Sequence, residues 1–366
     1  MIKIIVLGTR GIPDVQGGVE THCQELYPRL VKQGCDVTVI TRTPYILKED
    51  RKSEYAGVKL KHIYAPRKKS IEAIIHTFLG ILYARLKSPD ILHIHAIGPS
   101  LLIPFARLLG LRVIMTHHGP DYDRHKWGHI AKLILLCGEY AGAKFANSVI
   151  VISKVIGKIL EVKYGRNNYI LIHNGVNPAI KNDNDDYINS LGLEPDNYMI
   201  AVGRFVEEKG FHDLVDAYKG LLSSDVKLVL VGDADHESTY SLSLKKQARE
   251  GNVVLTGFIK GQKLQQIFSH ARLFVMPSYH EGLPIALLEA MSYNLPVLVS
   301  NIPANKEVEL EDDDYFEVGN VQQLRGKLIS KLESNTLPEY SDLIKKKYNW
   351  DLVAKQTFSS YFKLMG

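Results

Sequence analysis

Short apolar runs alternate with amphipathic segments along most of the chain. In the first half, apolar runs of strand length fall at residues 2–7, 36–41, 58–64, 91–95, 112–117, 148–153 and 169–173. Segments whose apolar positions recur at helical spacing fill most of the gaps, for example 19–33, 70–87, 99–109 and 129–145. Because strands covered on both faces are apolar throughout, this alternation predicts a mostly parallel sheet with helices on both sides.

A second alternation follows a polar stretch in the middle of the chain. The first pattern ends around Asn174–Pro178, and Lys181–Asp186 is polar. Strand-like runs then recur near 198–203, 227–232, 253–257, 272–276 and 296–300, without any visible sequence repeat. The sequence therefore predicts an α/β protein with two Rossmann-like domains facing a cleft. The predicted parts are residues 1–178, a linker at 179–196, residues 197–345 and a terminal helix at 346–366.

Composition places the chain among soluble proteins of two-domain size. Its 366 residues are too many for one core, and 45% hydrophobic with 23% charged residues is ordinary for a globular protein. No apolar run reaches the ~20 residues that span a bilayer, and the amino terminus reads as a first strand rather than a signal peptide. Cys23, Cys35 and Cys137 lack metal or redox spacing. We therefore expect a cytoplasmic protein.

The two halves of the chain carry opposite net charge. Residues 1–190 contain 26 Lys and Arg against 16 Asp and Glu, whereas residues 191–366 contain 19 against 24. This asymmetry favours an anionic partner on one side of the molecule. No nucleic-acid motif is present, so we expect no nucleic acid and favour a peripheral position on an anionic membrane surface. The apolar segment at 71–83 is either a membrane-docking helix or a core helix. It is preceded by a basic run of Lys59, Lys61, Arg67, Lys68 and Lys69.

Candidate chemistry lies where strands end and helices begin. Apolar positions at helical spacing predict a helix that starts just past Gly282, with Pro284 in its first turn. Glu281 then lies at the carboxyl end of a strand, where open α/β sheets bind their ligands. Free backbone N–H groups from Gly282 and Leu283 onward would suit a diphosphate. Alternatively, Glu281 is a helix N-terminal charge and Glu289 is solvated.

Two other loops place positive charge or glycine between a strand and a helix. Arg204 and Lys209 share one such loop and would form a diphosphate clamp, unless the loop only pairs its charges with Glu207–Glu208. Gly17 and Gly18 immediately precede a helix and would let the backbone approach a phosphate, or they serve only the geometry of a flexible loop. Gly8 and Gly11 could start an NAD fingerprint, but position 13 is proline and the third glycine is absent from its place, so we do not expect NAD binding.

Histidines and paired aspartates suggest metal binding, but their spacing does not support it. Four histidines lie near strand ends: His93, His95, His117 and His118. Their spacing does not match that of a known zinc site, and His93 is expected in the core. The pairs Asp121/Asp123 and Asp233/Asp235 imitate an Asp-x-Asp metal motif, which arises readily by chance in loops. We predict no metal.

Four separated motifs occur in an order that resembles the retaining, nucleotide-sugar-dependent glycosyltransferases of family 4. They are the Gly17-Gly18 loop, His118-Gly119, Arg204 with Lys209, and the Glu-x7-Glu signature of Glu281 and Glu289. The glycine-rich loop is most similar to a branch of rhamnosyl and related transferases of polysaccharide biosynthesis. The resemblance covers nearly the whole chain and implies the two-domain GT-B fold, in which the terminal helix crosses back to the first domain.

The resemblance also implies roles for individual residues. His118 would contact the donor sugar, Glu281 its hydroxyls near the reacting carbon, and Glu289 the ribose hydroxyls. Arg204 and Lys209 would bind the diphosphate. Further donor-binding positions would be Gly17, Gly18, Gly257, Phe258, Ile259, Gly282 and Leu283. On the acceptor side, the loop from Asp121 to Trp127 suits a sugar, and the candidate residues are Glu20 and Asp121.

The implied activity is transfer of a sugar from a nucleotide-diphosphate donor to a saccharide acceptor, in particular a lipid-diphosphate-linked one. The reaction would need no metal and no cofactor, since the nucleotide-sugar is a substrate. No nucleophilic carboxylate is evident, which favours attack on the same face as the leaving group, with the leaving phosphate accepting the proton. Two alternatives are a UDP-sugar 2-epimerase-like enzyme and a non-catalytic assembly partner.

Overall fold

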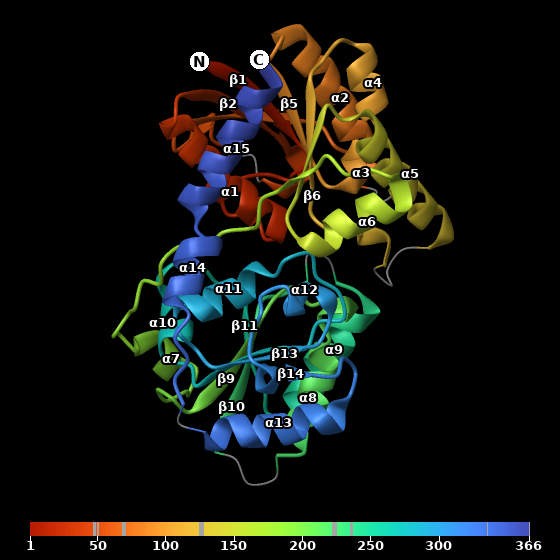
Figure 1. The fold of residues 1–366 in the computed structure, drawn as a ribbon. Helices are drawn as coiled ribbons and strands as arrows, with labels where there is room; N and C mark the ends of the chain where they lie inside the picture. Colours follow the sequence, from red (N-terminus) through yellow and green to blue (C-terminus); the bar gives the residue numbers. More distant parts are fainter. Residues whose placement is uncertain are drawn as a thin grey trace. The chain divides into compact units, whose positions relative to one another are not determined.

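A computed structural model describes residues 1–46, 49, 51–67, 71–123, 128–221, 225–234, 237–334 and 336–365. The chain forms two compact units (Figure 1). The first consists of Met1–Gly175 together with Asn349–Gly366, and the second of Val176–Tyr348. The segment 179–196, expected from its polarity to be a linker, lies within the second unit and contains the short helix α7 (Asp186–Ser190).

The described part of the first unit holds an eight-stranded sheet with the order β3-β4-β2-β1-β5-β6-β7-β8. Its strands are β1 (Ile2–Leu7), β2 (Cys35–Arg42), β3 (Glu54–Tyr55), β4 (Val58–Ile63), β5 (Ile91–His95), β6 (Val113–His117), β7 (Ser148–Val151) and β8 (Ile170–Leu171). All neighbours pair in parallel except β3 with β4. The expected strands are therefore present, and only the two-residue β3 escapes a pattern that depends on apolar runs.

Helices cover the sheet of the first unit. They are α1 (Gly18–Lys32), α2 (Glu72–Lys87), α3 (Ile97–Ser100), α4 (Ile103–Leu108), α5 (His129–Phe145), α6 (Lys154–Tyr164) and α15 (Trp350–Met365), with 3-10 turns η1 (Thr43–Tyr45) and η2 (Asp121–Asp123). The single helix expected at 99–109 is two helices, because Pro104 has no N–H to donate to the carbonyl of Ser100.

The second unit has a six-stranded parallel sheet among its described residues, with the order β11-β10-β9-β12-β13-β14. Its strands are β9 (Tyr198–Val202), β10 (Lys227–Val231), β11 (Val254–Gly257), β12 (Leu273–Met276), β13 (Val297–Ser300) and β14 (Tyr315–Phe316). Its helices are α7, α8 (Phe211–Lys219), α9 (Thr239–Glu250), α10 (Gln262–Ser269), α11 (Ile285–Ser292), α12 (Pro303–Lys306), α13 (Val321–Glu333) and α14 (Ser341–Lys347), with η3 (Glu207–Lys209) and η4 (Asp312–Asp314).

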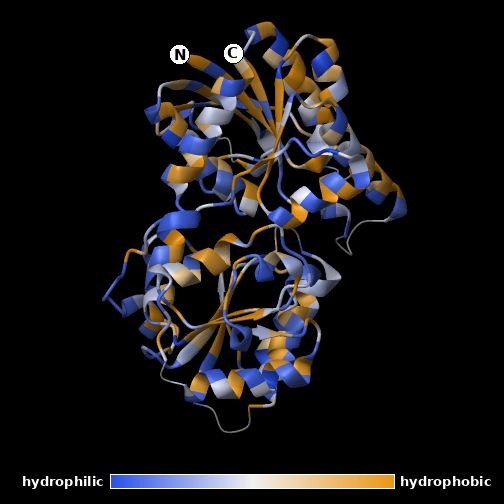
Figure 2. Cartoon of the chain, in the orientation of Figure 1, coloured by the Kyte–Doolittle hydropathy of each residue, from blue (hydrophilic) through white to orange (hydrophobic). Residues whose placement is uncertain are grey.

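Apolar strands lie at the centre of each unit (Figure 2). In the second unit, one cluster of buried side chains joins the sheet to α8, α9 and α13; it includes Met199, Leu214, Leu230, Leu244 and Leu328. Such burial is the main favourable contribution to folding. It fixes the strands, and therefore the loops at their carboxyl ends, which carry the candidate site.

The carboxyl-terminal segment consists of two helices rather than one. Helix α14 ends at Lys347, and the side chain of Asn349 then accepts a 2.7 Å hydrogen bond from the Asp351 backbone N–H at the start of α15. Helix α15 packs along α1 in the first unit (Figure 1). At their contact, Arg29 Nε lies 2.9 Å from Asp351 Oδ1. No helix in the described ranges is both long and apolar enough to cross a membrane.

Candidate active site

The loops after β9 and β12 meet at the point where the strand order of the second sheet reverses. From this pair the chain winds outward in both directions, first through β10 and β11 and later through β13 and β14. Such a reversal leaves a crevice at the carboxyl ends of the strands, the usual ligand site of open α/β sheets. The backbone N–H of Tyr279 donates to the carbonyl of Glu208 over 2.9 Å and ties the two loops together.

Two predicted residues, Lys209 and Glu281, form an ion pair at this crevice. Lys209 Nζ lies 2.5 Å from Glu281 Oε1, and the two side chains are only 18% and 11% exposed. The hydroxyl of Ser278 donates to the same carboxylate oxygen over 2.6 Å. Both of these contacts are made to Oε1, and the second carboxylate oxygen can accept a hydrogen bond from a ligand.

The environment of Glu281 keeps its carboxylate charged. Burial by itself raises the pKa of Glu281, but the charge and hydrogen bond of Lys209, with help from Ser278, more than offset this and lower the pKa below its ordinary value. The site therefore presents a negatively charged acceptor, Glu281, beside a positively charged donor, Lys209, and both are largely shielded from water. Hydrogen bonds of this kind are stronger than neutral ones.

Glycine is required at one position of the Lys209 loop. Gly210 has a φ of +65°, and a Cβ atom there would lie 2.1 Å from the carbonyl oxygen of Pro277. The absence of a side chain thus lets the β9 and β12 loops approach each other. Arg204 lies half-buried on the same loop, which is anchored by a 3.1 Å hydrogen bond from Phe205 N–H to Asp233 O.

The remaining predicted donor residues of the second unit lie at or after neighbouring strand ends, except Glu289, which lies within helix α11. Gly257 ends β11 with a φ of +68°. Phe258, the next residue, is 48% exposed, so its ring is accessible for stacking. Helix α11 begins at Ile285 rather than just past Gly282, so Pro284 is its N-cap instead of a residue of its first turn. Gly282 and Leu283 precede this helix, and Ile259 and Glu289 are half-buried.

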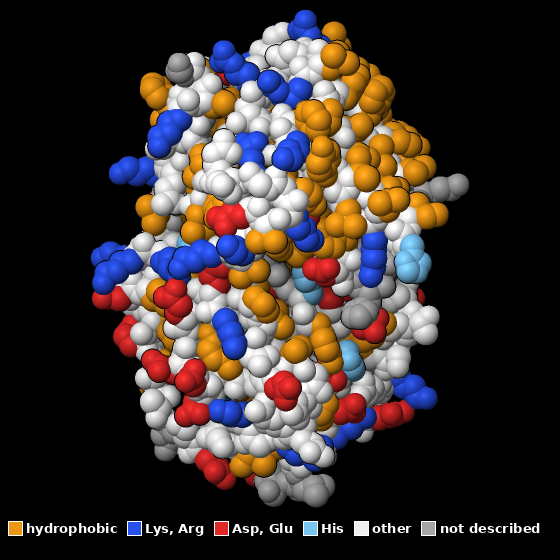
Figure 3. Space-filling model, turned by 45° about the vertical axis from the view of Figure 1, so that its right-hand side comes forward, with side chains coloured by type: hydrophobic (Ala, Val, Ile, Leu, Met, Phe, Trp, Pro, Cys, Tyr) orange, Lys and Arg blue, Asp and Glu red, His pale blue; other side chains and the backbone are white. Residues whose placement is uncertain are grey.

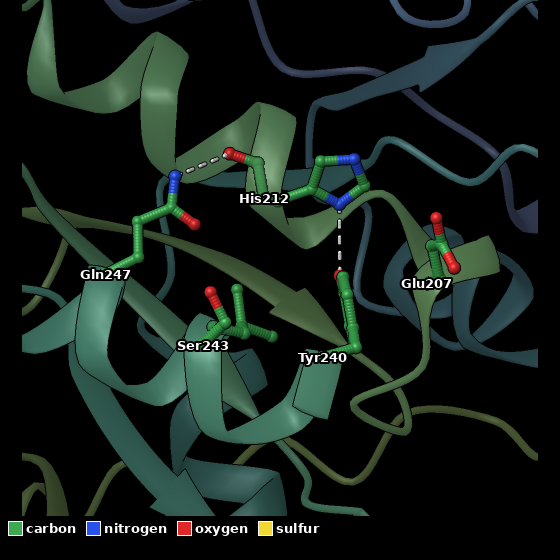
Figure 4. A pocket seen from close by; sticks show the side chains of 6 residues that line it. Glu207, His212, Tyr240, Ser243 and Gln247 are labelled. Carbon is green, nitrogen blue, oxygen red and sulfur yellow. Dashed lines mark hydrogen bonds between the residues drawn. The ribbon is translucent and has the colours of Figure 1, made fainter. Parts of the chain in front are cut away.

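A small pocket that the sequence did not indicate lies behind the Lys209 loop, between α8 and α9 (Figure 4). In it the Nδ1 atom of His212 and the hydroxyl of Tyr240 are 3.1 Å apart. The other lining residues are Glu207, Ser243, Leu244 and Gln247. Its volume of about 230 Å³ is below the several hundred Å³ typical of sites for larger ligands, so it does not suit a nucleotide-sugar.

In the first unit, the loop between β1 and α1 folds around Glu20. The Oε1 atom of Glu20 accepts from the Arg10 backbone N–H over 2.9 Å, and its side chain is buried. Gly17 is the N-cap of α1, and a Cβ atom there would lie 2.1 Å from Glu20 Oε2. Glu20 therefore shapes the glycine-rich loop. Its suggested contact with an acceptor stays a prediction.

His118 follows β6 and belongs to a cluster with two other histidines, His22 and His95. One ligand-capable atom from each lies within 4.8 Å of the others. Burial and the neighbouring histidines hold the pKa of His118 well below its ordinary value, so the ring is neutral at physiological pH. His22 was not singled out from the sequence, because a lone histidine inside an amphipathic helix carries no spacing signal.

Within this cluster, the geometry of the His95–His118 pair is that of a hydrogen bond rather than of two ligands on one ion. His95 Nδ1 and His118 Nε2 are 2.8 Å apart, while their ring centres are 5.1 Å apart. Two imidazoles with this N···N distance that shared an ion at about 2.05 Å would have ring centres roughly 4.4 Å apart. The longer separation means that the two nitrogens point at each other. A linear N–H···N bond has this arrangement.

Asp121 lies on the turn η2, which is held in place by hydrogen bonds to the buried carboxylate of Glu139. Glu139 Oε1 lies 2.9 Å from His117 Nε2, and both of its oxygens lie 3.1 Å from the Tyr122 hydroxyl. Because His117 Nδ1 accepts from the Gly119 N–H over 3.1 Å, its proton is on Nε2 and faces Glu139. The turn that carries Asp121 is thus held beside His118. The rest of the expected acceptor loop, residues 124–127, lies outside the described residues, as does Asp235.

Comparison with known proteins agrees with this architecture. Residues 16–180 match the family model described as Glycosyltransferase Family 4, and residues 183–350 match the one described as Glycosyl transferases group 1. With two Rossmann-like units and these two matches, the chain is a glycosyltransferase of the GT-B fold. Its first half belongs to the family 4 domains and its second half to the group 1 domains.

Two relatives and one solved structure illustrate the similarity. An uncharacterized glycosyltransferase of Methanocaldococcus jannaschii is 26% identical over 100% of both chains. The UDP-Gal:α-D-GlcNAc-diphosphoundecaprenol α-1,3-galactosyltransferase of Escherichia coli is 29% identical over 69% of this chain and 72% of its own. Anabaena HepE, solved in complex with UDP-glucose, superposes with a TM-score of 0.82 at 17% identity, covering 99% of this chain and 100% of its own. This likeness concerns the fold.

Proposed function

We propose that the protein transfers a sugar, with retention of anomeric configuration, from a nucleoside-diphosphate donor to a lipid-linked saccharide in cell-surface polysaccharide assembly. The observation that carries this proposal is the Lys209–Glu281–Ser278 constellation at the reversal point of the second sheet. It combines a fixed carboxylate acceptor for sugar hydroxyls with a cation for the diphosphate. HepE, which has this fold, has been solved in complex with UDP-glucose.

The residues of the second unit would act on the bond between the sugar C1 and the diphosphate oxygen. As this bond breaks, negative charge grows on the leaving nucleoside diphosphate. Lys209, Arg204 and backbone N–H groups before α11 would stabilise that charge. Glu281 would hold sugar hydroxyls, and His118 would hydrogen-bond the sugar. The acceptor hydroxyl attacks C1 on the face that the diphosphate leaves, and the departing phosphate oxygen takes its proton.

A lipid-linked acceptor is supported by a relative and by the surface of the first unit. The Escherichia coli galactosyltransferase takes, by its name, a diphosphoundecaprenol-linked sugar. In the first unit, α2, α4 and α5 expose large apolar side chains, which form much of the hydrophobic area in Figure 3. They include Phe78, Leu82, Leu86, Leu108, Ile130 and Leu133.

This apolar surface suits an anionic membrane. Leu86 and Leu108 are 83% and 84% exposed, and the Phe78 ring of α2 stacks on Phe105 of α4 at 5.3 Å between ring centres, so the two helices form one surface. Arg85 and Lys87 lie in the last turn of α2 beside it. Exposed apolar groups next to cations favour an interface with acidic lipid headgroups. Lys68 and Lys69, expected to contribute, lie outside the described residues.

A thermal-shift screen tests the donor site. Wild type and Arg204→Ala would be heated with UDP, GDP, dTDP and ADP, alone and with sugars attached, including dTDP-rhamnose because of the family resemblance. One nucleotide should raise the wild-type melting temperature by linkage and have much less effect on Arg204→Ala. If no nucleotide shifts well-folded wild type, the donor assignment fails and the protein is an assembly partner. Interconversion of the donor sugar without any acceptor would instead identify an epimerase.

A further inference from the structure

A row of buried side chains leads from His118 into the interior of the first unit. His118 Nε2 lies 2.8 Å from His95 Nδ1, and the other ring nitrogen of His95 hydrogen-bonds the Tyr27 hydroxyl. The Tyr27 hydroxyl lies 3.1 Å from His93 Nδ1, which in turn lies 2.6 Å from the Tyr361 hydroxyl. The row thus joins β6 to β5, α1 and the terminal helix α15.

All groups beyond His118 are removed from solvent and uncharged. Tyr27, His93, His95 and Tyr361 are each 0% exposed. Burial lowers the pKa of His93 to about 3 and raises the pKa of Tyr27. A neutral imidazole has one N–H and one bare nitrogen, so His95, which bonds through both nitrogens, must donate on one side and accept on the other. His93 meets both tyrosine hydroxyls through Nδ1, and its Nε2 lies 2.7 Å from Thr116 Oγ1. An unsatisfied nitrogen at this depth would be costly.

The His95–His118 pair can therefore be ordered in only two ways. Tyr361 reaches Tyr27 through His93, because both tyrosine hydroxyls are hydrogen-bonded to His93 Nδ1. If Tyr27 donates to His95, then His95 donates to His118, and the His118 proton is on Nδ1. If His95 donates to Tyr27, then His118 donates to His95, and the His118 proton is on Nε2. Tyr27 has one proton, so it cannot support both orders at once.

We propose that Tyr27 and Tyr361 are positioning residues that hold His118 in a single tautomer. Among the described contacts, His118 makes its hydrogen bond to the protein through Nε2, which leaves Nδ1 for a ligand. The order of the row decides whether Nδ1 offers a donor or an acceptor to that ligand. A terminal helix more than two hundred residues away in sequence thereby sets the chemistry of His118. Its effect on catalysis rests on the proposed role of His118, but its effect on the tautomer does not.

The tautomer is measured directly by NMR on ¹⁵N-histidine-labelled protein without substrate. Long-range ¹H–¹⁵N spectra show which nitrogen of each ring is protonated, and His118→Gln assigns the His118 signals. Wild type should show one His118 tautomer. Tyr27→Phe and Tyr361→Phe should each give an average of both, because the hydroxyl that orders the row is gone. Using two variants guards against one that fails to fold.

Tyr198→Phe is the matched control. Tyr198 is also 0% exposed and loses a comparable hydrogen bond, from its hydroxyl to Ile267 O at 2.8 Å, but it lies in the second unit. Its His118 signals should equal those of wild type. The inference is overturned if wild type already shows mixed tautomers, or if Tyr27→Phe and Tyr361→Phe both keep the wild-type tautomer.

Transferase kinetics then separate this inference from the proposed function. Loss of the ordering hydrogen bond should lower kcat of Tyr27→Phe by about tenfold, with a smaller change in donor KM. If no variant, including wild type, transfers sugar although the tautomer responds, the proposed function fails and the positioning inference stands. If transfer occurs but neither the tautomer nor kcat responds, only the positioning inference fails.

Discussion

Replacing Lys209 with methionine should turn Glu281 from a stabilising into a destabilising group. Lys209 Nζ lies 2.5 Å from Glu281 Oε1, and neither side chain is more than 18% exposed. Methionine keeps most of the apolar stem of lysine and removes the ammonium, so the packing of the loop is largely preserved. Among the hydrogen bonds of the described residues, the carboxylate then keeps that of the Ser278 hydroxyl in a mostly dry site.

The size of the effect follows from the exposure of the pair. A hydrogen bond to a charged group contributes ~1.5–3 kcal/mol, and the remaining access of water places this one at about 2 kcal/mol. For a unit of this size, Val176–Tyr348, such a loss lowers the melting temperature by roughly 4–8 °C.

The pH dependence should change sign in the variant. In wild type, burial raises the pKa of Glu281, but Lys209 and Ser278 more than offset this, so the folded pKa lies below the unfolded one. The pair therefore contributes stability above the unfolded pKa and loses it as pH falls through the folded pKa. In Lys209→Met, burial dominates and raises the folded pKa. The variant should then recover part of its deficit when the pH is lowered from about 7.5 to about 5.

Differential scanning calorimetry of four proteins tests this reasoning. They are wild type, Lys209→Met, Glu281→Gln and the double variant, each at both pH values. The double variant should lose less than the sum of the single losses, since the second change removes the unpaired charge. Additive losses, together with a Lys209→Met deficit that does not depend on pH, would refute the account of the pair.

Three further predictions concern the loop, the histidine cluster and the surface. Gly210→Ala should lower the free energy of unfolding by at least about 2 kcal/mol, because the φ of Gly210 is +65° and a Cβ there would lie 2.1 Å from Pro277 O. Gly326→Ala is the control, since Gly326 has open space around it in helix α13, and this change should be neutral or stabilising by ~0.5–1 kcal/mol. Chemical denaturation measures both. Treatment with EDTA should leave transfer unchanged, and a loss restored by added zinc would overturn the hydrogen-bonded geometry of the cluster. Leu86→Asp should weaken co-sedimentation with anionic vesicles. Leu337→Asp, at a position 80% exposed in the second unit, should not weaken it. If the wild-type protein bound neutral vesicles equally well, the proposal that the apolar surface binds an anionic membrane would be contradicted.

The sheets could be predicted because their strands are apolar on both faces. The pattern marks β1 at residues 2–7 and β5 at 91–95 with the bounds that the structure gives. It misses β3 and β14, which have two residues each and too little sequence to show a pattern. It merges α3 with α4, because helical spacing continues across Pro104 while the hydrogen bonds do not.

The candidate site was predicted as a set of residues but not as a geometry. Lys209 and Glu281 could be placed at strand ends, yet their pairing depends on the order of β9 and β12 in the sheet, which the sequence does not display. The row from His118 to Tyr361 could not be foreseen for the same reason. It joins residues whose side chains meet only after α15 has packed against α1.

The most direct test of the proposed function is a transfer reaction analysed by NMR. The donor selected by the thermal-shift screen would be incubated with diphosphoundecaprenol-linked saccharides and wild-type protein, with Lys209→Met as the control. The account predicts release of nucleoside diphosphate that depends on the acceptor, and a product whose new linkage keeps the anomeric configuration of the donor. An inverted linkage would contradict the retaining mechanism, and the absence of any transfer with a bound donor and a full acceptor panel would contradict the proposed activity itself.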